Sequence, residues 1–160
     1  MYARDEALIA TPIGTIRLRG GEHMLESIRI EDDETAVSRG TARAVRAAAD
    51  QLLQWFAAER RDFDLPLEPA ATARGGVLRQ GMVNISFGKT ESYGTLARRV
   101  DSAARAIGQA CARNPFPIVV PCHRVIGSGG ALGHYSAGAG VATKRWLLEF
   151  ERKVLGVDLL

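Results

Sequence analysis

Apolar and polar residues alternate in three short runs near the start of the chain, which is the pattern of strands that bury one face. The runs cover residues 6–10, 15–19 and 24–30. Turn-forming residues separate them, because Thr11-Pro12-Ile13-Gly14 follows the first run and Gly20-Gly21 follows the second. Short turns join antiparallel neighbours, so we expect a three-stranded antiparallel meander.

Residues 41–59 carry apolar side chains at helical spacing, namely Val45, Ala49, Leu52, Leu53 and Phe56. This apolar face predicts a helix that covers the sheet, since an uncovered meander would leave its own apolar face in water. The acidic run at residues 31–34 is interpreted as a solvated loop, and residues 62–65 are a candidate edge strand. We find no catalytic constellation in residues 1–70.

The second half of the chain reads as mainly helical, with expected helices at residues 77–83, 92–100, 102–113 and 141–152. Ser92 and Ser102 are good N-caps for the middle pair, and the short break at Asp101 indicates a helix-turn-helix. Close packing of small residues is the other explanation for the Ala- and Gly-rich helix at 102–113. The predicted fold class is α+β: a small N-terminal antiparallel sheet with a covering helix in residues 1–70, then a mainly helical domain in residues 71–160.

The stretch NPFPIVVPCHRV places a cysteine in an unusual setting. Prolines fix the backbone and remove amide donors, so we expect residues 118–120 to be extended and to present Cys122 on a rigid stalk. His123 and Arg124 follow directly, and neighbours of this kind lower the pKa of a thiol from about 8.5. The alternative is that Cys122 is one more small buried hydrophobe, as most free cysteines are.

Charge is divided unevenly along the 160 residues, whose formal net charge is +3. Residues 1–88 hold 11 basic and 13 acidic side chains, whereas residues 89–153 hold 10 basic and 4 acidic ones. A basic excess around the thiol favours a nucleic-acid partner over a merely solvated face. The length fits one domain, or two small ones that share a core.

Several classes of protein are disfavoured by composition. No apolar run approaches the roughly 20 residues of a membrane span, and the first residues do not resemble a signal peptide. Two cysteines without export signals indicate a reducing compartment, so we expect a cytoplasmic protein. The cysteines and the three histidines lack metal-binding spacing, so we expect no metal site.

The pentapeptide PCHRV, preceded by NPFPIVV and followed by GSGGALGHYS and KRWLLEFE, strongly resembles the methylated-DNA–protein-cysteine methyltransferases. The resemblance is close over residues 87–151 and loose in the N-terminal half. It implies a ribonuclease-H-like N-terminal domain and a C-terminal domain that binds double-stranded DNA through the minor groove. It also implies a monomer that uses no cofactor and transfers the alkyl group of O6-alkylguanine, and possibly of O4-alkylthymine, irreversibly to Cys122.

The same resemblance implies roles for individual residues. Cys122 would be the nucleophile, His123 its base through a water, and Tyr93 a donor to the leaving guanine. Glu151 would orient His123, although an ion pair with Lys144 or Arg152 would also explain an acid in the last turn of its helix. The guanine would contact carbonyls at Cys122 and Val125 and the backbone of Tyr135 and Ser136. Asn114 would be a hinge between the recognition helix and the cysteine segment.

Arg105 matches the arginine that fills the gap left by an extruded base, which fits the physics of proteins that open a groove. The remaining DNA contacts implied by the resemblance are Ser92, Ala104, Arg113 and Arg124. The chain departs from the family at residues 74–86, where Arg74 and Arg79 stand roughly where Phe and Trp are usual and Ser86 replaces a Pro.

Two other functions stay open at this point. One is a lesion-binding relative that flips the damaged base without transferring the alkyl group. The altered segment at residues 74–86 favours it, and the presence of Cys122 argues against it. The other is a cysteine hydrolase that uses Cys122 and His123, but the sequence shows no obvious oxyanion hole at a helix N-terminus.

Overall fold

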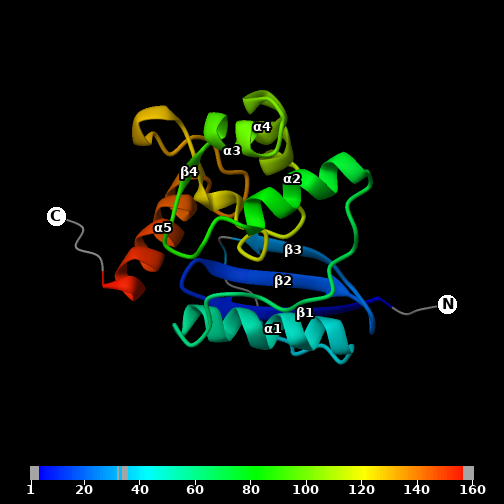
Figure 1. The fold of residues 1–160 in the computed structure, drawn as a ribbon. Coiled ribbons are helices and arrows are strands. Elements are labelled where there is room, and N and C mark those ends of the chain that lie inside the picture. The colour runs from blue at the N-terminus through cyan, green and yellow to red at the C-terminus, as the bar shows by residue number, and fades with distance from the viewer. Residues whose placement is uncertain (1–3, 32, 34–35, 157–160) are drawn as a thin grey trace. The chain divides into compact units, whose positions relative to one another are not determined.

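A computed structural model describes residues 4–31, 33 and 36–156 of the chain (Figure 1). The chain divides into two compact units, Met1–Glu68 and Pro69–Leu160. The first unit contains an antiparallel sheet and one α-helix, and the second contains four α-helices and a two-stranded parallel pair among the described residues. The predicted α+β fold class is confirmed.

The sheet of the first unit consists of β1 (Asp5–Thr11), β2 (Gly14–Gly20) and β3 (Leu25–Glu31), in the order β1-β2-β3. Ile9 and Ile30 both lie opposite Ile16, so their side chains share one buried face. At the end of β2, a Cβ on Gly20 would lie 2.5 Å from the Met24 carbonyl oxygen, so this tight return needs a glycine. The predicted meander is confirmed.

Helix α1 (Arg43–Phe56) covers one face of this sheet (Figure 1). Its buried face includes Val45, Leu52 and Trp55. No side chain of its own caps the helix. Asp5 of β1 does so instead, because its Oδ2 accepts from the backbone N–H of Ala42 at 2.7 Å and from that of Thr41. These hydrogen bonds lower the pKa of Asp5 and tie the start of the helix to the sheet.

The candidate edge strand at residues 62–65 is wrong. The Gln51 side chain accepts from the backbone N–H of Asp64 and donates to its carbonyl, at 2.9 Å each, so the backbone of Asp64 bonds to a side chain and not to a neighbouring strand. Pairing is limited to one parallel bridge between Leu25 and Leu67. In the acidic run at residues 31–34, Asp32 and Glu34 lie outside the described residues, and Glu31 forms an ion pair with Arg17.

The helices of the second unit are α2 (Ala73–Val83), α3 (Tyr93–Arg99), α4 (Ala104–Ala112) and α5 (Val141–Leu155). Its strands are β4 (Glu91–Ser92) and β5 (Val125–Ile126), and its 3₁₀ turns are η1 (Cys122–Arg124) and η2 (Ser128–Gly130). Strands β4 and β5 pair in parallel, which brings the start of α3 beside the end of η1. Within the described ranges, none of the helices has the length and apolar character needed to cross a membrane.

Helices α3 and α4 form the predicted pair, but only one predicted cap is correct. Ser92 caps α3, because its Oγ accepts from the Thr95 N–H at 3.1 Å. Ser102 does not cap α4, which begins after Ala103 without a side-chain cap. The Ser102 N–H instead donates to the Ala97 carbonyl at 2.7 Å and closes the end of α3.

Helix α2 begins four residues before the predicted start, because Thr72 caps it by accepting from the Gly75 N–H at 2.9 Å. The two arginines that depart from the family pattern find polar and aromatic partners. Arg74 donates to the carbonyls of Val100 and Asp101 at the end of α3, and the Arg79 guanidinium lies 5.2 Å from the centre of the Phe116 ring. Cation–π and carbonyl contacts therefore hold this helix in the second unit.

Candidate active site

Residues 114–121 form a compact turn, so the predicted extended stalk is wrong. The Asn114 side chain accepts from the Phe116 N–H at 3.0 Å and donates to the Val120 carbonyl at 2.8 Å. The Val120 N–H returns to the Phe116 carbonyl at 2.8 Å, and Ile118 adopts a positive φ of 74°. This loop is fixed by one amide side chain rather than by its prolines.

The same amide reaches the thiol, because Nδ2 of Asn114 lies 3.2 Å from Sγ of Cys122. The Asn114 backbone N–H also donates to the Cys111 carbonyl at the end of α4. The Asn114 side chain therefore holds the segment that leads to Cys122, while its backbone N–H reaches α4; its role as a hinge stays a prediction.

Glu151 of α5 organises a fully buried polar cluster. Its carboxylate accepts from Nε2 of His123 at 2.7 Å, from the Gly88 backbone N–H at 2.9 Å and from the guanidinium of Arg124 at 2.9–3.1 Å. Burial opposes ionisation of Glu151, but the hydrogen bonds and charges of His123 and Arg124 outweigh it and lower its pKa to about 2. The acid is therefore ionised, and its partners are neither Lys144 nor Arg152.

Arg124 lies inside the protein, with 4% of its surface exposed. Besides its bonds to Glu151, it donates to the Ile85 carbonyl at 2.7 Å and lies over the Phe87 ring. The prediction that Arg124 contacts DNA is corrected by this burial. Its charge is used to hold Glu151 ionised.

Burial lowers the pKa of His123, while the Glu151 charge opposes that shift. A neutral imidazole that donates Nε2–H to a carboxylate carries its lone pair on Nδ1. The ring is therefore held as the tautomer whose Nδ1 can accept a proton. This is the state that a general base requires.

The Cys122 thiol is 5% exposed, and burial raises its pKa; the Asn114 hydrogen bond and the charge of Lys144 act in the opposite direction without cancelling it. The expectation that neighbouring His123 and Arg124 lower this pKa is wrong, because Arg124 is bound to Glu151 and His123 is neutral. The thiol at rest is therefore protonated.

Cys122 opens onto a cavity of about 620 Å³, which is in the range of small-molecule sites. The walls come from α3, α4 and the loop before α5, and they are mostly apolar. The lining residues are Tyr93, Arg105, Gly108, Gln109, Cys111, Ala112, Cys122, Gly133, His134, Tyr135 and Ser136.

The loop before α5 closes tightly on Tyr93. Gly133 has a φ of 75°, and a Cβ there would lie 3.0 Å from the Tyr93 hydroxyl, so a larger residue would be strained and would crowd the ring. Burial and the two nearby thiols raise the pKa of Tyr93, which keeps its phenol protonated. The Tyr135 side chain is buried, and its hydroxyl has no hydrogen-bond partner among the described residues, while the Ser136 hydroxyl donates to the Ala112 carbonyl at 3.4 Å.

Lys144 is a site residue that sequence reasoning missed. Its side chain is fully buried, and Nζ donates to the Val125 carbonyl at 2.7 Å and to the His134 carbonyl at 3.3 Å. Burial lowers the pKa of Lys144, and the two nearby cysteines, Cys111 and Cys122, act in the opposite direction. The signal was available: Lys144, Leu147 and Glu151 recur at helical spacing on the buried face of α5.

The comparisons with known proteins place this site in a family. Residues 77–153 match the model of the 6-O-methylguanine DNA methyltransferase DNA-binding domain. A Mycobacterium bovis protein named methylated-DNA–protein-cysteine methyltransferase is 38% identical over 157 residues, which cover 94% of each chain. The chain belongs to the methylated-DNA–protein-cysteine methyltransferase family. A relative of that name from Methanosarcina acetivorans is 36% identical over 154 residues, covering 91% of this chain and 96% of the relative.

A solved structure supports the family fold. The crystal structure of Mycobacterium tuberculosis OGT in complex with DNA matches with a TM-score of 0.80 and 36% identity, and the match covers 93% of each chain. The same organism's O6-methylguanine methyltransferase matches with a TM-score of 0.81 over 98% of each chain. The α+β architecture is therefore shared with methyltransferases of this family.

The residues predicted to contact DNA in this family member are divided between surface and interior. Arg105 and Ala104 are exposed at the start of α4, and Arg105 also lines the cavity; Arg113 is exposed just after the same helix. Ser92 is half-buried and serves as the cap of α3. Arg105 and Ala104 thus lie at the start of α4 and Arg113 directly after its end, whereas Arg124 is buried in the turn η1.

The second cysteine, Cys111, is a different kind of group from Cys122. It lies half-buried in the cavity wall, and burial raises its pKa to about 12, so it stays a neutral thiol. Within the described ranges, no group of three or more His, Cys, Asp or Glu side chains is arranged to hold a metal ion.

Proposed function

We propose that this chain repairs DNA by transferring the alkyl group of O6-alkylguanine to Sγ of Cys122. The observation that carries the proposal is the position of the Cys122 thiol, which lines a cavity of about 620 Å³, while the next residue in the same turn, His123, is hydrogen-bonded to Glu151. DNA repair by alkyl transfer is the activity named for its relatives, and it follows here from family membership. The proposal includes O4-alkylthymine as a second substrate of the same site.

The reaction is a displacement at a saturated carbon. Nδ1 of His123 takes the thiol proton through a water, and the Glu151 carboxylate stabilises the imidazolium that forms. The Cys122 thiolate attacks the alkyl carbon, the new S–C bond forms as the C–O6 bond breaks, and the electron pair of the broken bond goes to the guanine. Because the resting thiol is protonated, transfer depends on the His123–Glu151 pair.

The leaving guanine needs a proton and fixed hydrogen bonds. The protonated Tyr93 phenol, in the cavity wall, supplies a proton to ring N3. The backbone at Tyr135 and Ser136 donates toward O6, and the carbonyls of Cys122 and Val125 accept from the guanine amino group. The Val125 carbonyl already accepts from Lys144, which leaves its second lone pair for the base.

Helix α4 enters the minor groove of double-stranded DNA, with Ala104 and Arg113 near the backbone. Its small residues permit close approach, and Arg105 occupies the gap in the base stack after the damaged base has turned into the cavity. Ser92, at the start of α3, lies in the same helix pair. We propose that residues 71–160 perform this recognition as a domain distinct from residues 1–70, and that a monomer in the cytoplasm suffices.

The product is a thioether, which is not hydrolysed under mild conditions, so each molecule acts once. Cys111 would not reverse it, since an S-alkyl bond does not exchange with a thiol as a disulfide does. The reaction as written uses no cofactor and no metal.

Intact-mass spectrometry tests the proposal. The chain is incubated with a duplex oligonucleotide that carries O6-methylguanine, and the mass and the modified peptide are determined. We expect a gain of one methyl group on Cys122, retained after prolonged incubation, in the wild type and in Cys111→Ser, but not in Cys122→Ser, which should still bind the duplex. Binding without a mass gain would indicate a lesion-binding protein, and repeated turnover without an adduct would indicate a hydrolase.

A further inference from the structure

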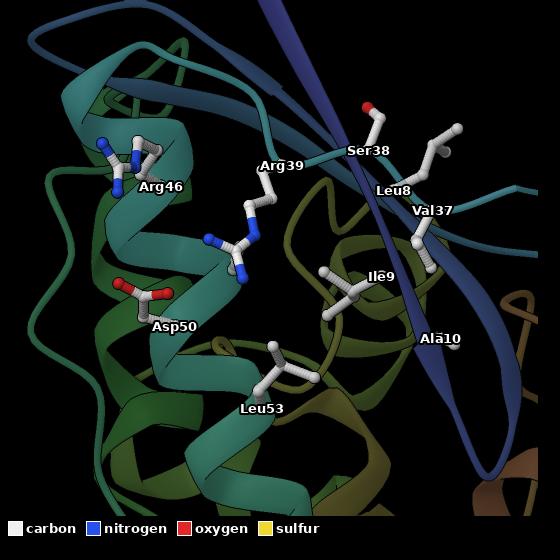
Figure 2. A pocket seen from close by; sticks show the side chains of 10 residues that line it. Leu8, Ile9, Ala10, Val37, Ser38, Arg39, Arg46, Asp50 and Leu53 are labelled. Atoms are coloured by element: carbon white, nitrogen blue, oxygen red, sulfur yellow. The ribbon is translucent and has the colours of Figure 1, made fainter.

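The N-terminal unit contains a groove that the proposed repair reaction does not use. It has a volume of about 400 Å³ and lies between the edge of β1, the segment that precedes α1, and α1 itself (Figure 2). The lining residues are Leu8, Ile9, Ala10, Val37, Ser38, Arg39, Arg46, Ala49, Asp50 and Leu53. All of them belong to the first unit, whereas the cavity beside Cys122 is lined by the second.

One wall of the groove is an open strand edge. Strand β1 is at the edge of the sheet, and Leu8 forms a single antiparallel bridge with Ser38 through hydrogen bonds of 2.8 and 3.0 Å. Hydrogen-bonding direction alternates along a strand, so Ala10 points its N–H and carbonyl the same way as Leu8. Among the described residues neither group of Ala10 has a partner on that side. An unpaired edge of this kind is a template for another strand.

The other walls carry charge and exposed apolar surface. Arg39 and Arg46 form no ion pair within the described part of the chain, and Asp50 lies one turn beyond Arg46 on α1. In Figure 2 the Arg39 side chain extends toward α1, while Val37 and Ile9 lie on the strand side. Val37 is 66% exposed and Leu53 is 45% exposed. The two guanidiniums of Arg39 and Arg46 and the carboxylate of Asp50 sum to a net charge of +1, which one carboxylate of a ligand would neutralise.

We propose that this groove binds an extended peptide segment of a partner protein, which adds to the β1 edge at Ala10. One acidic side chain of the peptide lies between Arg39 and Arg46, and an aliphatic side chain on the same face of the peptide covers Val37 and Leu53. Main-chain hydrogen bonds to Ala10 give affinity, and the two side chains give specificity, as in other cases of strand addition.

The spacing of the two anchors defines the motif. Arg46 and Leu53 are seven residues apart on α1, about 10 Å along the helix axis. Residues two apart in a strand point to the same side and lie about 6.8 Å apart. This distance is shorter than the about 10 Å between Arg46 and Leu53 along α1, and the long Arg46 side chain spans the gap of about 3 Å. The motif is therefore an acid, any residue, and an aliphatic residue.

Selection of random nonapeptides displayed on phage against the full chain tests this inference. We expect enriched peptides to share the acid–x–aliphatic motif. A synthetic copy of the strongest should bind with an affinity lowered at least tenfold by Arg46→Glu and unchanged by Arg29→Glu, an exposed arginine on β3 outside the groove. Peptide binding should also slow hydrogen exchange of the Ala10 amide, and Arg46→Glu should leave alkyl transfer intact.

Three results would overturn the proposal. The first is the absence of enriched peptides, or enriched peptides without an acid. The second is equal binding to Arg46→Glu, or an Ala10 amide whose exchange does not slow. The third is concentration-dependent self-association of the chain that Arg46→Glu abolishes, which would make a second copy the occupant in place of a partner peptide.

Discussion

His123 and Glu151 meet across 28 residues of sequence, with Nε2 and Oε2 2.7 Å apart and both side chains fully buried. This hydrogen bond fixes the tautomer of the imidazole next to the Cys122 thiol. The Arg124 guanidinium keeps the acid ionised from its other side. Cys122 and His123 therefore come from one 3₁₀ turn, and Glu151 comes from one helix.

The ionised Glu151 predicts an acid-dependent loss of stability. Its pKa falls from 4.5 to about 2 on folding, so its ionised form contributes about 3 kcal/mol to the free energy of unfolding. This contribution is complete above pH 4.5 and is lost as the pH falls toward 2, because a depressed carboxyl pKa stabilises only the deprotonated state. Urea unfolding at a series of pH values should show this decline in wild type and a smaller one in Glu151→Gln. An equal decline in both would contradict the assignment.

The buried thiol predicts weak reactivity toward a simple alkylating reagent. Burial raises the pKa of Cys122 above its usual 9.0, so little thiolate exists at neutral pH in the absence of DNA. In a Cys111→Ser background, we expect iodoacetamide to modify the native chain at pH 7 much more slowly than the urea-unfolded chain, and the rate to rise only above about pH 9. Rapid modification of the native chain at pH 7 would instead indicate a thiolate at rest.

Replacement of Asn114 should damage both the loop and the thiol. Asn114→Ala removes the donor to Val120 and Cys122 and the acceptor of the Phe116 N–H, and each buried group left without a partner costs about 1–3 kcal/mol. We expect a lower melting temperature and a slower transfer to an O6-methylguanine duplex. Asn84→Ala is the matched control, because the Asn84 side chain makes an exposed hydrogen bond to Gln80. Similar effects of both substitutions would argue against the role of Asn114.

Lys144→Met should reduce transfer more than DNA binding. The substitution leaves the carbonyls of Val125 and His134 without their donor and removes a positive charge that lowers the pKa of Cys122. We expect slower transfer at saturating duplex, and a pH profile that moves to higher pH, since the thiol becomes harder to ionise. Lys153→Met, an exposed lysine on the same helix, should behave as wild type. An unchanged pH profile in Lys144→Met would limit Lys144 to packing.

The elements that sequence predicted well are those set by local periodicity. The three strands and α1 follow from alternating and helical spacing of apolar residues, and Ser92 capped its helix as a serine before a helix usually does. Each of these depends on neighbours within a few residues. Helix α1 begins at Arg43, two residues after the predicted start at residue 41, because its cap is Asp5 on β1, and a residue so distant in the sequence gives no local signal.

The features that sequence predicted wrongly depend on distant partners or on one unusual backbone angle. The prolines of residues 115–121 favoured an extended segment, but Asn114 and the positive φ of Ile118 turn it instead. Arg124 was expected among the DNA contacts because of the family resemblance, and its buried partner Glu151 lies 27 residues away in the sequence. Helical spacing places Lys144 on the buried face of α5, but its acceptors are the backbone carbonyls of Val125 and His134, which sequence does not reveal.

Arg105 provides the test that separates base extrusion from chemistry. It lies at the start of α4 and lines the cavity, so it can replace the stacking of a base that has left the duplex. Arg105→Ala should slow transfer from duplex O6-methylguanine by about tenfold or more, because unstacking a base costs a few kcal/mol. Transfer from free O6-benzylguanine, which needs no extrusion, should change little. Single-turnover rates on both substrates measure the difference, with Arg29→Ala as a control from the other unit. Equal losses on duplex and free base would assign Arg105 to the cavity itself and remove it from the DNA-opening step.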